Sequence, residues 1–104
     1  MKTVYSYYVL DIVHRGHLEM MKNAKAIAGK DGKSIVGILT DEAVMEKKAK
    51  PIVSFEERIE LARAIEYVDV VVGQETYSPL PNVKKIKPDI LMESASHSEE
   101  AIEE

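Results

Sequence analysis

Two histidines and a glycine carry the clearest potential for chemistry in this chain. His14 and His17 flank Gly16 in the run His-Arg-Gly-His. Because glycine has no side chain, Gly16 lets the backbone approach an anion closely and permits a positive φ angle. Imidazole N–H groups can donate hydrogen bonds to phosphate oxygens, and a helix that begins here points its own N–H groups into the same space. The run therefore predicts a phosphate-binding loop.

Such a loop suits group transfer at phosphorus. Negative charge builds on the α-phosphate oxygens of a nucleoside triphosphate while an oxyanion attacks and pyrophosphate leaves. Fixed donors aimed at that charge lower the barrier. Positioning supplies most of the remaining acceleration, since no covalent intermediate is needed. We therefore predict that His14 and His17 are catalytic donors.

Two alternatives for this histidine pair stay open at this point. A His-x-x-His pair taken alone is usually two surface or capping residues. The second alternative is a metal site with Asp11 as the third ligand. The glycine and the helix start fit an anion better, so we predict no protein-held metal. Asp11 by itself is expected to cap the loop.

A second candidate segment is basic. Lys47, Lys48 and Lys50 precede Pro51, and Arg58 follows on a predicted helix. The simplest interpretation is a solvated loop and an ordinary helix-surface arginine, and we prefer it for Lys48. The functional interpretation is that Lys47 and Lys50 fold over the triphosphate or the acceptor phosphate, while Arg58 anchors phosphate oxygens.

The elements that must position these residues alternate between strands and helices. Short apolar or β-branched runs predict strands at 3–9, 34–39, 67–72 and 89–92. Apolar periodicity and capping residues predict helices at 16–28, at 41–46 after Thr40, after the capping box that begins at Ser54, at 83–86, and from Ser96 or Ser98.

This alternation predicts an α/β fold with a parallel sheet covered by helices on both faces. Right-handed crossovers make it a Rossmann-like, doubly wound sheet in three α/β/α layers, formed as a single domain by residues 1–104. Ligands of such sheets bind beyond the carboxyl ends of the strands. The first strand ends near Val9, directly before the histidine loop, so the motif stands where this fold places ligands.

Residues 7–25, YYVLDIVHRGHLEMMKNAK, resemble the signature of the cytidylyltransferase branch of the His-x-Gly-His nucleotidyltransferase superfamily. In that family a strand runs into Gly-x-Phe-Asp-x-x-His-x-Gly-His and then a helix. The matching positions are Asp11, His14, Gly16 and His17. Tyr8, Val9 and Leu10 stand where the family usually has Gly-Thr-Phe. The resemblance implies nucleotide contacts by Val9, Leu10, Asp11 and the histidine loop.

Residues 40–72 resemble the same family through its Thr-Asp-Glu, Lys-x-x-x-Pro, Glu-x-Arg and Val-Asp-x-Val succession. Two motifs in the right order are more specific than one histidine pair, and together they cover residues 3–92. We expect Asp41 and Asp69 to be structural. The matching positions are Thr40, Asp41, Glu42, Lys47, Pro51, Glu57, Arg58, Val68 and Asp69.

One family element has no counterpart here. Members carry a Ser/Thr-rich helix start, often Arg-Thr-x-Gly-Ile-Ser-Thr-Thr, that helps to bind the triphosphate. We therefore expect residues 1–104 to form the nucleotide-binding domain without its C-terminal helix. His97 stands in the loop after the fourth predicted strand, either on the base side of the site or exposed to solvent.

Composition limits the classes of partner. The chain has 104 residues and a net charge of −4, which argues against a general nucleic-acid binder. It contains no cysteine and no apolar run long enough for a membrane span. We expect a cytoplasmic protein.

The resemblance implies that a phosphorylated or phosphonylated small molecule attacks CTP and releases pyrophosphate, with Mg²⁺ neutralising the triphosphate. Implied acceptors are glycerol 3-phosphate, phosphoethanolamine, phosphocholine and 2-aminoethylphosphonate, and a homodimer is expected. An adenylyltransferase of the same superfamily is the first alternative, although the Lys47–Pro51–Arg58 pattern favours the cytidylyl branch. The second alternative is a degenerate module that binds a nucleotide or dimerises without turnover.

Overall fold

A computed structural model of the chain describes residues 2–13 and 15–93. Strands and helices alternate along most of this length, as predicted. In chain order the elements are β1 (Thr3–Tyr8), α1 (Arg15–Ala28), β2 (Lys33–Leu39), α2 (Asp41–Met45), α3 (Phe55–Arg63), β3 (Val70–Gln74), α4 (Leu80–Ile86) and β4 (Ile90–Met92).

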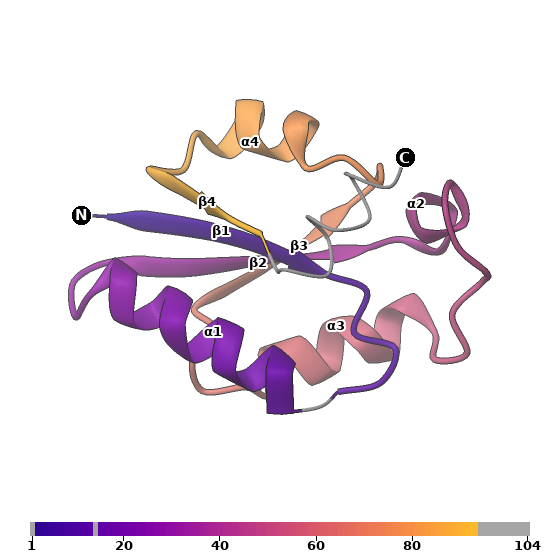
Figure 1. Cartoon of the computed structure of the whole chain (residues 1–104), viewed down its shortest axis with the longest axis horizontal. Helices are drawn as coiled ribbons and strands as arrows, with labels where there is room; N and C mark the ends of the chain where they lie inside the picture. Colours follow the sequence, from indigo (N-terminus) through magenta and orange to yellow (C-terminus); the bar gives the residue numbers. More distant parts are fainter. Residues whose placement is uncertain (1, 14, 94–104) are drawn as a thin grey trace.

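The four strands form one parallel sheet in the order β3-β2-β1-β4. Helices α1 and α3 lie on one face of the sheet and α4 lies on the other, while α2 follows the carboxyl end of β2 (Figure 1). The sheet therefore changes its direction of winding between β1 and β4. This arrangement confirms the predicted Rossmann-like α/β fold and makes the carboxyl ends of β1 and β4 a topological switch point.

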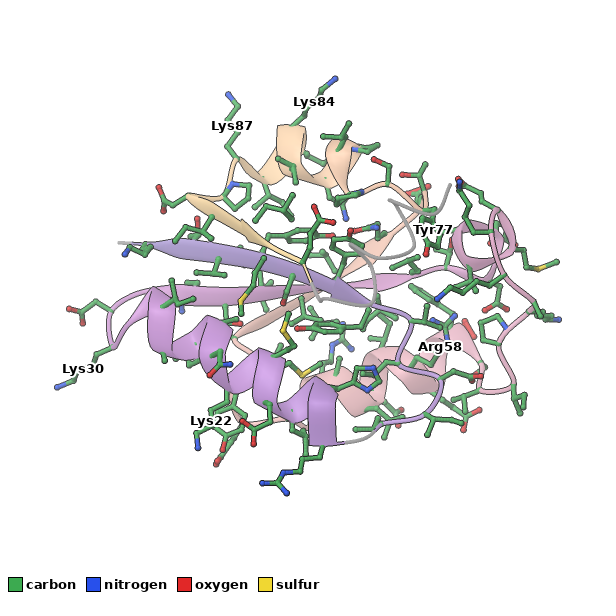
Figure 2. All side chains as sticks on the ribbon, viewed as in Figure 1. Lys22, Lys30, Arg58, Tyr77, Lys84 and Lys87 are labelled. Atoms are coloured by element: carbon green, nitrogen blue, oxygen red, sulfur yellow. The ribbon has the colours of Figure 1, made fainter. Side chains whose placement is uncertain are left out.

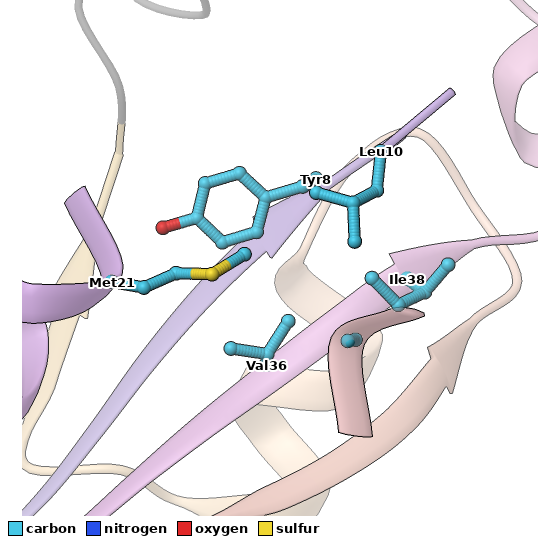
Figure 3. Packing of buried hydrophobic residues seen from close by; sticks show 6 residues of the cluster. Tyr8, Leu10, Met21, Val36 and Ile38 are labelled. Atoms are coloured by element: carbon cyan, nitrogen blue, oxygen red, sulfur yellow. The ribbon is translucent and has the colours of Figure 1, made fainter. Parts of the chain in front are cut away.

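Alternating side chains of the strands build a separate core on each face of the sheet. Toward α1 and α3, Tyr8 and Val36 pack with Met21 of α1 and Ala62 of α3 (Figure 3). The opposite core, toward α4, consists of Tyr5, Tyr7, Leu39, Ala43 and Val44 with partly buried side chains such as Val83 and Ile86.

Local capping signals in the sequence are confirmed. The Thr40 side chain accepts a hydrogen bond from the Ala43 N–H, and the Ser54 side chain accepts one from the Glu57 N–H. Gly29 has a φ of 82° directly after α1, where glycine relieves the strain of the left-handed conformation.

Two element starts differ from prediction by three residues. β3 begins at Val70 rather than at residue 67, because Tyr67 and Val68 pack as a turn against the α1/α3 core and Asp69 binds elsewhere. The Asp69 carboxylate accepts from the Ser34 N–H and the Lys25 ammonium, both at 2.8 Å, which confirms its structural role.

α4 begins at Leu80 rather than at residue 83, with Pro81 in its first turn, where the missing N–H costs nothing. The helix predicted from Ser96 or Ser98, and His97, lie outside the described residues. Within the described residues, no helix combines the length and the apolar character needed to cross a membrane.

Candidate nucleotide site

His17 lies in the first turn of α1, close to the carboxyl end of β1. Its half-buried imidazole meets the Tyr8 ring edge to face, with centroids 5.8 Å apart and an interplanar angle of 80°. Tyr8 itself is buried in the core toward α1. His17 is therefore held at the border between this core and the open carboxyl edge of the sheet. His14 lies outside the described residues.

The backbone between β1 and α1 turns at Leu10, which has a φ of 64° and a buried side chain. This left-handed conformation costs a residue with a Cβ about 1–2 kcal/mol. Gly16 permits a positive φ, but the left-handed residue of this loop is Leu10. Gly16 is the exposed second residue of α1, where it adds no side chain to the helix start.

Asp11 joins this loop to the segment before α3. Its carboxylate accepts hydrogen bonds from the backbone N–H groups of Val53 at 2.8 Å and Ile52 at 3.2 Å. These two bonds, that from Val53 most strongly, and the nearby Arg58 charge hold the pKa of Asp11 below its usual value. The carboxylate thus has the capping role expected from the sequence.

Arg58 requires a correction. It was predicted to lie at the helix surface or to anchor phosphate oxygens, but its side chain is 0% exposed. The guanidinium donates to the carbonyls of Leu39 at 2.6 Å, Val9 at 2.8 Å and Val53 at 3.1 Å. It also forms an ion pair with Asp41 at 2.7 Å. With four N–H donors used inside the protein, Arg58 joins the ends of β1 and β2 (Figure 2).

Val53 is held from both sides, because Asp11 accepts its N–H and Arg58 binds its carbonyl. We call Asp11, Asp41, Val53 and Arg58 the Arg58 corner. It fixes the segment before α3 against the loop that leads to His17. The corner stabilises the backbone at the carboxyl edge of the sheet, and the Arg58 N–H groups in it bind protein acceptors.

The three lysines of the basic segment lie between α2 and α3, on the same edge of the sheet. Lys47, Lys48 and Lys50 are all exposed. The backbone N–H groups of Lys47 and Lys48 close a turn on the Val44 carbonyl at 3.1 and 2.8 Å. The fold thus brings the basic segment and the α1 start to one edge.

No group of three His, Cys, Asp or Glu side chains suited to a metal ion occurs within 2–13 and 15–93. The metal alternative, with Asp11, His14 and His17 as ligands, includes His14, which lies outside the described residues.

A polar network on the α4 face went unnoticed in the sequence. The Tyr5 hydroxyl donates to Gln74 at 2.6 Å and accepts from the Asn82 amide at 2.9 Å. A Cβ on Gly37 would overlap the Tyr5 hydroxyl, so this site requires glycine. The alternation of tyrosines in β1 was the available signal for this network, since residues 5 and 7 must share a face.

Tyr7 and Glu93 meet across the switch point. The Tyr7 hydroxyl donates to the Glu93 carboxylate at 3.0 Å, which joins the carboxyl ends of β1 and β4. Burial, and then the hydrogen bond and charge of Glu93, raise the pKa of Tyr7. This polar contact lies on the side of the sheet opposite to His17.

Comparison with known proteins gives this site a context. Residues 9–102 match the model of a family described as cytidylyltransferase-like. The FAD synthase of Methanopyrus kandleri is 34% identical over 91 residues, which cover 88% of this chain and 61% of that protein. The FAD synthase of Pyrococcus abyssi is 40% identical over 85 residues, covering 80% and 55%. The chain therefore spans somewhat more than half the length of these relatives.

Two further similarities extend the range of relatives. The bifunctional protein HldE of Campylobacter fetus is 33% identical over 97 residues, covering 91% of this chain and 20% of that protein. The crystal structure of the lipopolysaccharide core biosynthesis protein from Thermoplasma volcanium matches with a TM-score of 0.79 and 26% identity. That match covers 88% of this chain and 72% of the other.

Proposed function

Since the chain belongs to the cytidylyltransferase-like family of nucleotidyltransferases, we propose that it transfers AMP from ATP to a phosphate-bearing acceptor. The observation that carries this proposal is the similarity to FAD synthases, at up to 40% identity. FAD is FMN joined to AMP through a pyrophosphate linkage, so its synthesis from FMN is an adenylyl transfer. FMN is therefore the first acceptor to test.

This proposal replaces CTP, the nucleotide predicted from the sequence, with ATP, the nucleotide of the alternative. The CTP prediction relied on the succession Lys47–Pro51–Arg58, and it is not confirmed. The Arg58 guanidinium donates to backbone carbonyls at the ends of β1 and β2 and pairs with Asp41. It therefore stabilises the sheet edge whichever base is bound. The motif reports the fold of the family, and the named relatives are the better guide to the nucleotide.

The proposed chemistry uses the residues at the start of α1 and in the basic segment. An acceptor phosphate oxygen attacks the α-phosphorus of MgATP, a new P–O bond forms, and the bond to the bridging oxygen breaks as pyrophosphate leaves. His14, His17 and the N–H groups of the α1 start stabilise the charge on the α-phosphate. Lys47 and Lys50 attract the acceptor phosphate, and no proton transfer is needed at the reacting atoms.

A degenerate binding module is the second candidate, because the sequence lacks a match to the family's Ser/Thr-rich helix start and Tyr8 replaces a glycine of the family pattern. The Tyr8 ring points into the core toward α1 and supports His17, so it leaves the carboxyl edge open. This placement favours the enzyme over the module.

Calorimetry with ATP and with CTP, followed by a pyrophosphate-release assay with FMN, tests the proposal on the full chain. We expect tighter binding of ATP and FMN-dependent release of pyrophosphate. Preference for CTP would contradict the adenylyl assignment. Nucleotide binding without pyrophosphate release would establish the module instead, provided that glycerol 3-phosphate, phosphoethanolamine, phosphocholine and 2-aminoethylphosphonate also fail as acceptors.

A further inference from the structure

Exposed apolar side chains gather at one edge of the sheet. Among residues 2–13 and 15–93, nine large apolar side chains are exposed. Six of them lie in segments at the carboxyl edge, and only Ile27, Leu61 and Val70 lie elsewhere. Exposed apolar residues that cluster mark a binding surface more often than scattered ones do. The six are Ile12, Val13, Leu18, Met45, Ile52 and Leu80.

Ile12 and Ile52 are the most exposed of this group, at 73% and 91%. They come from two loops far apart in the sequence that the Asp11 carboxylate joins, since it binds the Ile52 N–H and directly precedes Ile12. Pro51 is buried and Val53 is bonded on both sides, so the backbone beside Ile52 is anchored. Two apolar side chains are therefore held at the surface by fixed backbone.

The surroundings of this pair indicate the chemistry of its ligand. Lys50 precedes Ile52 by two residues, Lys47 and Lys48 stand slightly earlier, and all three are exposed. A molecule that satisfies both features carries a phosphate at one end and a large apolar group at the other, and FMN, the acceptor proposed above, does so with its ring system. Glycerol 3-phosphate and phosphocholine supply the phosphate and lack the ring.

We propose that Ile12 and Ile52 form an apolar ledge that receives the ring system of the acceptor, while Lys47 and Lys50 bind its phosphate. The inference rests on the proposed function and adds the residues that select a ring-bearing acceptor over a small aliphatic phosphate. The ledge lies on the α1/α3 side of the carboxyl edge, beside the loop that leads to His17. An acceptor seated there points its phosphate toward the nucleotide.

The test compares Ile12→Ser and Ile52→Ser with Ile27→Ser, a matched control that is exposed on the last half of α1. Because the ledge residues are so exposed, both substitutions leave folding intact. We expect each to raise KM for FMN about tenfold, the order expected from losing the burial of an isoleucine side chain against a ligand. For both variants, KM for ATP and kcat should stay within about twofold of wild type. The Ile27→Ser control should stay within about twofold of wild type in all three constants.

A direct binding measurement separates this inference from the proposed function. FMN fluorescence, titrated with each variant in the absence of nucleotide, should give about tenfold weaker binding for Ile52→Ser and an unchanged value for Ile27→Ser. If FMN binds in this ledge-dependent way without being adenylylated, the ledge stands and the adenylyl transfer to FMN fails. Unchanged FMN affinity in Ile52→Ser would overturn the ledge. Sedimentation that shows a wild-type dimer and a monomeric Ile52→Ser variant would also overturn it, because Ile52 would then contact a second copy of the chain.

Discussion

The Arg58 corner and the exposed rim that contains His17, Lys47 and Lys50 stand at the same edge of the sheet and differ in what they do. Every donor that Arg58 uses goes to a protein acceptor, and its side chain is completely buried. The lysines of the rim are exposed, and His17 is half-buried against Tyr8. Residues from the two family motifs thus divide into those that stabilise the backbone at this edge and those that we propose contact a ligand.

The physical reason for this division is the cost of burying charge. A guanidinium in the interior is tolerated only when its hydrogen bonds and an opposite charge are supplied, and the carbonyls of Val9 and Leu39 together with Asp41 supply them. A cation in that state has little left to offer a phosphate. Substitutions in the corner should therefore reduce stability first, whereas substitutions in the rim should reduce turnover or affinity.

The largest effect is expected for Arg58→Met. This variant leaves Asp41 and three carbonyls without their partner, so the free energy of unfolding should fall by about 3–5 kcal/mol. Urea denaturation followed by circular dichroism measures it. Arg58→Lys should recover little of the loss, because one ammonium cannot reach four separated acceptors. A loss below about 1 kcal/mol in Arg58→Met would remove the distinction between corner and rim.

His17→Ala should show the opposite pattern. Removal of a donor to the α-phosphate is expected to lower turnover about 10²–10³-fold, while the protein stays folded. The pyrophosphate-release assay measures the rate and thermal denaturation checks the fold. Lys22→Ala, an exposed change on the same helix, is the control and should retain full turnover. Equal turnover in His17→Ala and Lys22→Ala would exclude His17 from the chemistry.

Lys47→Ala and Lys50→Ala should have smaller, purely kinetic effects. Each is expected to raise KM for the acceptor about two- to fivefold, because exposed charge pairs contribute modestly. The increase should shrink at high salt, which screens such interactions. Unfolding free energies should match wild type. If Lys50→Ala instead destabilised the fold, the residue would belong with the corner.

The smallest effect concerns the pH dependence of the corner. The folded-state pKa of Asp11 lies below its unfolded value, so its contribution is complete above about pH 4 and is lost as the pH falls through the folded-state pKa. Asp11→Asn should therefore lower the free energy of unfolding at neutral pH. The variant should also lose less of that free energy than wild type as the pH falls. Parallel urea midpoints from pH 7 to pH 3 in wild type and Asp11→Asn would contradict this linkage.

Local signals predicted much of the fold. The caps at Thr40 and Ser54 and the stop at Gly29 depend on residues within one helical turn, and the structure confirms them. The start of β3 escaped prediction because Asp69 binds Ser34 on β2, a contact that only the folded chain creates.

The candidate site was predictable in position but not in the role of each residue. The succession of strand, His-x-Gly-His loop and helix placed the site at the carboxyl edge, as found for His17. Burial of Arg58, the turn at Leu10 and the exposure of Ile52 follow from how distant segments pack. No local pattern separates an arginine that binds phosphate from one that binds strand carbonyls.

Product identification in a mixed reaction tests the central claim most directly. The full chain is supplied with FMN and equal concentrations of MgATP and MgCTP, and the flavin products are identified by mass, with His17→Ala run in parallel. Adenylyl transfer predicts FAD from the wild-type chain and at least a hundredfold less from His17→Ala. A cytidylylated flavin, or FAD formation at the same rate in His17→Ala, would contradict the account.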